Sequence, residues 1–177
     1  MKHVTIKVCT FDELSGDAKE RARDWYREGD CFYWQDEWWQ SAREFSAIAP
    51  VDIFRADIAC AHVDISWHGD DDVRGLSGLR AWKWMQNNGW FDLARRNAQG
   101  DCTLTGFIGD CPLFDPLAKY AETPGQVPDI EQVFYECAQS WACAAQRDYE
   151  WCNSDEAVDE NIISNGYEFT QQGEFWA

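Results

Sequence analysis

The side chains best suited to chemistry lie in one short segment, residues 60–68, which reads CAHVDISWH. If this segment is a β-strand, alternate side chains project to the same side, so His62, Asp64 and His68 share one face. An imidazole and a carboxylate on one face can bind a metal ion together, or act as a base and the group that orients it. The acids at 70–72 follow directly and could add oxygen ligands.

A strand with one solvated face explains the same pattern without any chemistry, because polar and apolar residues then alternate by default. The sequence also contains no phosphate-binding loop, nucleophile elbow or zinc-protease motif. We therefore predict a protein without catalytic residues, metal or cofactor. A metal-dependent enzyme that uses His62, Asp64 and His68 is the alternative.

The elements around this segment predict an α+β fold. Alternation favours strands at residues 3–9, 51–68, 102–108 and 167–170, with 51–68 as one bent strand or two paired strands. Helical spacing and capping residues favour helices at residues 10–28, 30–47, 79–85, 90–97, 117–120, 129–151 and 154–164. No repeat or linker interrupts the chain, so we predict a single domain, residues 1–177, with a small antiparallel sheet packed by several helices.

The segment CFYWQDEWWQ, residues 31–40, is unusually rich in aromatic rings. On a helix over 30–47, one apolar stripe forms the predicted core and consists of Trp34, Trp38, Ala42 and Phe45. Phe32 and Trp39 lie off that stripe and are either partly exposed or line a second buried face. The neighbouring residues are mainly acidic, which argues against stacking on single-stranded nucleic acid.

The eight cysteines include no C-x-x-C pair, and the N-terminus lacks the apolar segment of a secretory signal. We therefore predict free thiols, several of them buried, with Cys60 and Cys137 as examples, and disulfides are the alternative. No apolar run is long enough to cross a bilayer, which predicts a cytoplasmic protein without a membrane partner.

The formal net charge of −17 is the strongest global signal, and it is concentrated in the last third of the sequence. Residues 121–177 carry twelve acids and one base, Arg147. Such a field repels nucleic acid and attracts basic protein surfaces. We predict that the acidic helical part, residues 129–177, binds a basic protein and no nucleic acid directly. The candidate partner-binding residues are Asp129, Glu131, Glu136, Asp148, Glu150, Asp155, Glu156, Asp159, Glu160 and Trp39.

Two segments, FDELSGDAKERARDWYRE at 11–28 and NGYEFTQQGEF at 165–175, resemble a family of phage and prophage proteins that are often labelled antitoxin-like. The middle segment HGDDDVRGLSGLRAWKWM departs from the Gly-rich aromatic segment of that family. The resemblance implies a phage origin, a compact α+β fold and a location in the host cytoplasm.

Charge and resemblance together favour an inhibitor of a host nucleic-acid-handling defence complex. This would be an anti-CRISPR-like protein whose carboxylates mimic the phosphates of DNA. An antitoxin-like partner of a basic toxin uses the same charge and is a second hypothesis. An accessory phage protein, kept dispersed by its acidity, is a third.

Overall fold

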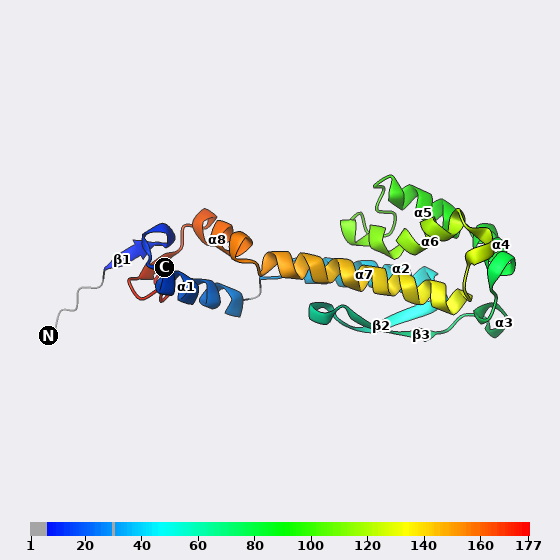
Figure 1. The fold of residues 1–177 in the computed structure, drawn as a ribbon, viewed down its shortest axis with the longest axis horizontal. Helices are drawn as coiled ribbons and strands as arrows, with labels where there is room; N and C mark the ends of the chain where they lie inside the picture. Colours follow the sequence, from blue (N-terminus) through cyan, green and yellow to red (C-terminus); the bar gives the residue numbers. More distant parts are fainter. Residues whose placement is uncertain (1–6, 30) are drawn as a thin grey trace. The chain divides into compact units, whose positions relative to one another are not determined.

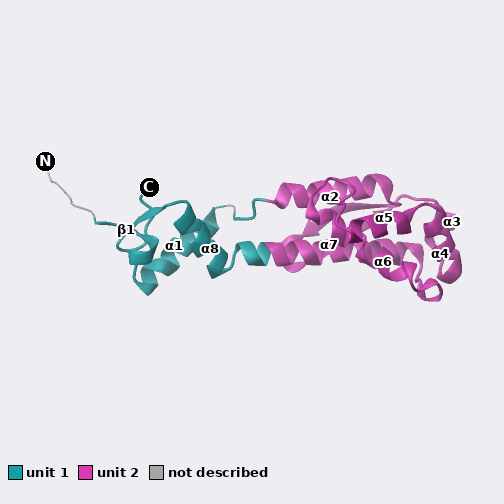
Figure 2. Ribbon diagram, turned by 90° about the horizontal axis from the view of Figure 1, so that it is seen from above, with its two compact units in different colours: residues 1–33, 149–177 teal, residues 34–148 magenta. Residues whose placement is uncertain are grey.

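The computed structural model describes residues 7–29 and 31–177. The chain divides into two compact units, unit 1 with residues 1–33 and 149–177, and unit 2 with residues 34–148 (Figure 2). The predicted α+β class is confirmed. The paired strands of the described residues form two separate two-stranded antiparallel sheets, whereas the sequence predicted one. The single domain stays a prediction.

Unit 1 is built from both ends of the chain. Its elements are β1 (Val8–Thr10), a 3-10 turn (Phe11–Glu13), α1 (Gly16–Glu28), α8 (Asp155–Ser164) and β4 (Glu168–Thr170) (Figure 1). β1 and β4 pair antiparallel, with Cys9 opposite Phe169. Most of the strand predicted at residues 3–9 lies outside the described residues. The two segments that resemble the phage family fall together in this unit.

The core of unit 1 follows the predicted helical stripe. Ala18 and Ala22 of α1 are fully buried against Ile162 of α8 and Phe169 of β4. Gly173 has φ +83°, and a Cβ there would collide with the carbonyl of Ala18. Only glycine fits at this close approach, which lets the C-terminal segment lie directly on α1.

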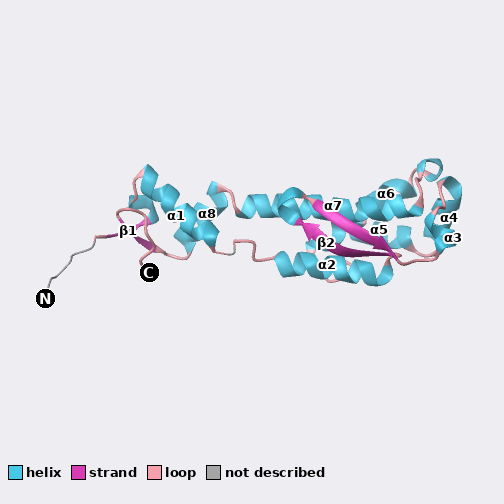
Figure 3. Cartoon of the chain, turned by 90° about the horizontal axis from the view of Figure 1, so that it is seen from below, coloured by secondary structure: helices cyan, strands magenta, loops and turns pink. Residues whose placement is uncertain are grey.

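Unit 2 is mainly helical, with one hairpin (Figure 3). Its elements are α2 (Gln35–Ile48), β2 (Val51–Asp57), β3 (His62–Trp67), α3 (Asp71–Arg74), α4 (Gly78–Asn87), α5 (Trp90–Ala98), α6 (Asp115–Ala121) and most of α7 (Ile130–Cys152), with 3-10 turns at Ile58–Cys60, Ile108–Leu113 and Pro124–Gln126. The helices predicted at 79–85, 90–97, 117–120 and 129–151 are confirmed.

The aromatic segment differs in part from its prediction. α2 begins at Gln35, and Trp34 is its N-cap, since the Trp34 carbonyl accepts the Trp38 N–H. Trp34 therefore precedes the first turn and is 51% exposed, so its prediction as a core residue is wrong. Trp38 and Phe45 are buried as predicted, and Phe32 is also buried.

The segment 51–68 forms two paired strands, one of the two alternatives predicted. Val51, Ile53 and Val63 are buried, and the register shifts between Ile53 and Arg55. Cys60 is exposed in the connecting turn, because the chain reverses there and does not continue as a strand. Its prediction as a buried thiol is therefore wrong.

The strand predicted at residues 102–108 is also wrong. The segment is a turn, because the buried carboxylate of Asp110 accepts the backbone N–H groups of Leu104, Thr105 and Gly106. Three successive N–H groups that point at one carboxylate are unable to alternate between neighbouring strands.

The last helices follow the sequence closely. α8 begins as predicted, with the Ser154 hydroxyl accepting the Ala157 N–H, and Gly166 after it has φ +66°. On α7, Phe134, Cys137 and Trp141 are fully buried. In the described part of the chain, no helix has the length and apolar character that a membrane span requires.

Candidate functional site

The structure brings together two of the three residues of the strand face. His62 Nε2 lies 3.3 Å from Asp64 Oδ1, and both side chains are accessible to solvent. His68 lies beyond the end of β3, where its backbone N–H donates to the Pro50 carbonyl. Asp70 is the N-cap of α3, and its carboxylate accepts the Asp72 N–H. Over residues 7–29 and 31–177, no group of three or more His, Cys, Asp or Glu could hold a metal ion.

The nine predicted acidic residues divide between the two units. Unit 2 holds Asp129, Glu131, Glu136 and Asp148, and unit 1 holds Glu150, Asp155, Glu156, Asp159 and Glu160.

In unit 1, the basic helix α1 neutralises part of α8. Nε and Nη2 of the Arg23 guanidinium donate to Asp159, at 2.6 and 2.7 Å, which raises the pKa of Arg23 above its usual range. Arg27 donates to Asp155. Glu156 and Glu160 are exposed and have no hydrogen bond or ion pair to any residue that the structure describes.

In unit 2, the four acids serve local structure. Arg74 donates two hydrogen bonds of 2.6 Å to Glu131, which lowers the pKa of that carboxyl. Glu136 accepts from a tyrosine hydroxyl, Asp148 accepts from the Trp38 indole at 2.9 Å, and Asp129 caps α7.

The charge asymmetry of the sequence is therefore much weaker in the fold. Unit 1 has 14 acids and six bases, net −8, and unit 2 has 18 acids and nine bases, net −9. Two of the acids of residues 121–177, Asp155 and Asp159, appear isolated in the sequence because their cations come from α1, more than a hundred residues away. Trp39, the predicted aromatic anchor, is half-buried with its ring against Trp141, at a centroid distance of 5.5 Å.

Unit 2 contains a groove that the sequence analysis missed. Its volume is about 550 Å³. Trp38 and Phe107 form an edge-to-face pair at 5.5 Å, and both line the groove. Trp34 and Ile108, which are 51% and 62% exposed, also line it. This much exposed apolar surface beside a hollow is typical of a binding site.

Carboxylates line the same groove, which we call the Trp34–Ile108 groove. Asp115 and Asp148 are among its lining residues. Burial raises the pKa of Asp115, and the charge of Arg147 opposes that shift. Asp148 is held by its hydrogen bond to Trp38. The groove thus combines an apolar surface with negative charge, which suits a side chain or segment that is both apolar and cationic.

Asp110 builds the loop that presents Phe107 and Ile108. Besides the three backbone N–H groups, its carboxylate accepts the hydroxyls of Ser41 and Thr105, at 2.7 and 2.8 Å. This buried network fixes the loop without a strand. Gly106 and Gly109 inside an apolar run were the available turn signal.

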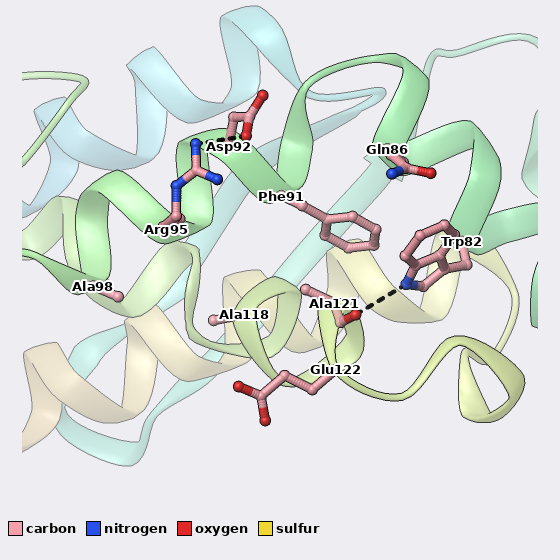
Figure 4. Close-up of a pocket in the computed structure, with 9 residues that line it drawn as sticks. All are labelled: Trp82, Gln86, Phe91, Asp92, Arg95, Ala98, Ala118, Ala121 and Glu122. Carbon is pink, nitrogen blue, oxygen red and sulfur yellow. Dashed lines mark hydrogen bonds and ion pairs between the residues drawn. The ribbon is translucent and has the colours of Figure 1, made fainter.

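A second hollow of about 490 Å³ lies among α4, α5 and α6 (Figure 4). Trp82 and Phe91 pack at 5.4 Å, and the Trp82 indole donates to the Ala121 carbonyl. Arg95 is paired with Asp92 at 2.8 Å. The lining has no His, Cys or Ser, and its two rings offer surface for a flat apolar molecule.

No protein-family model matches the chain, and neither the curated proteins nor the solved structures contain a match. The resemblance to a phage family stays a prediction.

Proposed function

We propose that this chain is an acidic binding protein for a basic protein surface, and that the Trp34–Ile108 groove is where the partner docks. The observation that carries the proposal is the exposure of Trp34 and Ile108 beside Asp115 and Asp148.

The groove has the features of an interface centre. Protein interfaces concentrate binding energy in a few aromatic and large apolar residues that pack into pockets, while charges at the rim control association rate and partner choice. A tryptophan at the groove supplies such an anchor, and its carboxylates attract a cationic partner. The net charge of −17 adds long-range steering toward the same kind of partner.

The finer proposal is that the partner is a host nucleic-acid-handling defence complex, whose phosphate-binding groove the protein occupies. The total charge supports this interpretation, and so does the exposure of the acids Glu156 and Glu160. An antitoxin-like role would use the same groove for a dedicated basic toxin.

The first test is a titration of the full-length protein with a labelled peptide that alternates Arg and Leu, followed by fluorescence anisotropy. Trp34→Ala and Ile108→Ala are each expected to weaken binding about tenfold or more, since central anchors contribute roughly 2 kcal/mol. Leu79→Ala is the matched control, because Leu79 is also a highly exposed apolar residue, at 60%, and does not line the groove. Equal losses in all three variants would reject the groove.

A second pair of variants tests whether the peptide binds at the groove or at the acids of α8. Asp115→Asn is expected to weaken peptide binding more than Glu156→Gln, and raising the salt is expected to weaken wild-type binding. If Glu156→Gln has the larger effect, the partner docks on α8, as the sequence predicted.

The choice of partner needs a competition experiment. Purified DNA-binding defence complexes, loaded with fluorescent DNA, are mixed with the protein at increasing salt. Displacement of DNA that weakens with salt supports phosphate mimicry. Absence of binding to these complexes, together with rescue of cells from a co-expressed basic toxin, supports the antitoxin-like role.

A further inference from the structure

Two cysteines of unit 2 lie side by side. The Sγ atoms of Cys102 and Cys111 are 3.7 Å apart, and both side chains are half-buried. A disulfide requires an S–S distance of about 2.0 Å, so the two Sγ atoms must approach each other by less than 2 Å.

The backbone around the pair is already ordered. Cys102 has φ +44°, a left-handed conformation that residues with side chains rarely adopt. Asn97 holds the next residue, since its side chain accepts the Thr103 N–H and donates to the Thr103 hydroxyl at 2.6 Å. The Cys111 thiol donates to the Asn97 carbonyl. The turn therefore keeps the two thiols together in spite of the strain at Cys102.

We propose that Cys102 and Cys111 form a redox modification site, in which a small disulfide such as oxidised glutathione converts the two thiols into an intramolecular disulfide. In the first step the Cys102 thiolate attacks one sulfur of oxidised glutathione, a mixed disulfide forms, and one glutathione thiolate leaves. In the second step Cys111 loses its proton to solvent and attacks Cys102 Sγ, and the second glutathione thiolate leaves. The cysteines lose two electrons and two protons, and the glutathione disulfide is reduced to two glutathione molecules.

The order of these steps follows from the surroundings of Cys111. Burial, and then the hydrogen bond with Cys102, raise the pKa of the Cys111 thiol to about 11. Burial also shields Cys111 Sγ and makes its thiolate harder to form, so we assign the first attack to Cys102.

The disulfide would close a ring over residues 102–111. That ring contains Phe107 and Ile108, which line the Trp34–Ile108 groove. Oxidation would thus restrict the loop that presents these two side chains, while the proposal itself does not depend on what the groove binds.

The test uses the full-length wild-type protein, equilibrated in mixtures of reduced and oxidised glutathione, then acid-quenched, alkylated and digested with trypsin. Cleavage after Arg96 and Lys119 gives a peptide of residues 97–119, which contains Cys102 and Cys111 and no other cysteine. Cleavage after Arg55 and Arg74 gives residues 56–74, whose only cysteine is the exposed Cys60. We expect the first peptide to lose two hydrogen atoms in mass, and the second to carry glutathione.

The same equilibrium, measured in urea, shows how readily the disulfide forms in the denatured chain, where only the short sequence separation of the two cysteines favours it. We expect the internal disulfide to be favoured roughly tenfold or more in the folded protein over the denatured chain, because the folded turn holds the thiols together. In Cys111→Ser, peptide 97–119 should instead retain glutathione on Cys102. The proposal is overturned if the folded wild-type protein shows no internal disulfide in this peptide, or no preference over the denatured chain.

Discussion

Replacement of Asp110 by alanine is expected to release the loop that carries Phe107 and Ile108. The carboxylate is fully buried and accepts five hydrogen bonds, three from backbone N–H groups and two from hydroxyls. In Asp110→Ala the three N–H groups lose their acceptor. Each of these partly buried groups, left unpaired, costs about 1 kcal/mol or more, so the three together should lower the free energy of unfolding by about 3 to 5 kcal/mol. With a slope of about 2 kcal/mol/M, the urea midpoint should fall by roughly 1.5 to 2.5 M.

Two matched variants make the prediction sharper. In Asp110→Asn the amide oxygen can still accept the backbone N–H groups, and the Ser41 and Thr105 hydroxyls can turn to accept from the amide nitrogen, so we expect less than half of the loss. In Asp101→Ala an exposed pair with Arg96 is removed, which should cost below about 1 kcal/mol.

Hydrogen exchange locates the effect. The amides of Leu104, Thr105 and Gly106 should exchange faster in Asp110→Ala and stay protected in Asp101→Ala. If the two alanine variants have equal urea midpoints, or if these amides exchange at wild-type rates in Asp110→Ala, the carboxylate does not organise the loop.

Two further predictions concern other parts of the chain. Gly173→Ala should destabilise the protein by about 2 kcal/mol or more in urea unfolding, because its φ of +83° and the Ala18 carbonyl exclude a Cβ. Gly125→Ala is the control and should be nearly neutral, because the space around Gly125 is open. Equal effects of the two substitutions would contradict the close approach of Gly173 to Ala18. Arg74 lowers the pKa of Glu131, so the stability that this pair adds is present above pH 4.5, the ordinary value, and is lost as the pH falls through the lower folded-state pKa. The stability difference between wild type and Arg74→Gln should therefore shrink in acid, and a difference that is constant from pH 7 to pH 2 would refute this assignment.

The long periodic elements could be predicted from the sequence. The apolar spacing of residues 129–151 and the caps Ser154 and Gly166 are local signals, and α7 and α8 follow them. The hairpin was predicted as one of two alternatives, because alternation alone does not show where a chain reverses.

Ion pairs between residues far apart in the sequence could not be predicted. Arg23 and Asp159 are 136 residues apart, so the acids of α8 appeared unpaired until α1 was placed against them. The turn at residues 104–106 depends on Asp110, and Leu104 and Thr105 resemble strand residues when that carboxylate is ignored. Since this turn presents Phe107 and Ile108, the Trp34–Ile108 groove was missed together with it.

Hydrogen exchange of the wild-type protein with and without the bound Arg-Leu peptide tests the central claim most directly. We predict slower exchange at residues 104–115, in the loop and turn that line the Trp34–Ile108 groove, and little change in α8. Protection confined to residues 155–164, with the groove loop unchanged, would contradict the account and return the site to the acidic helix.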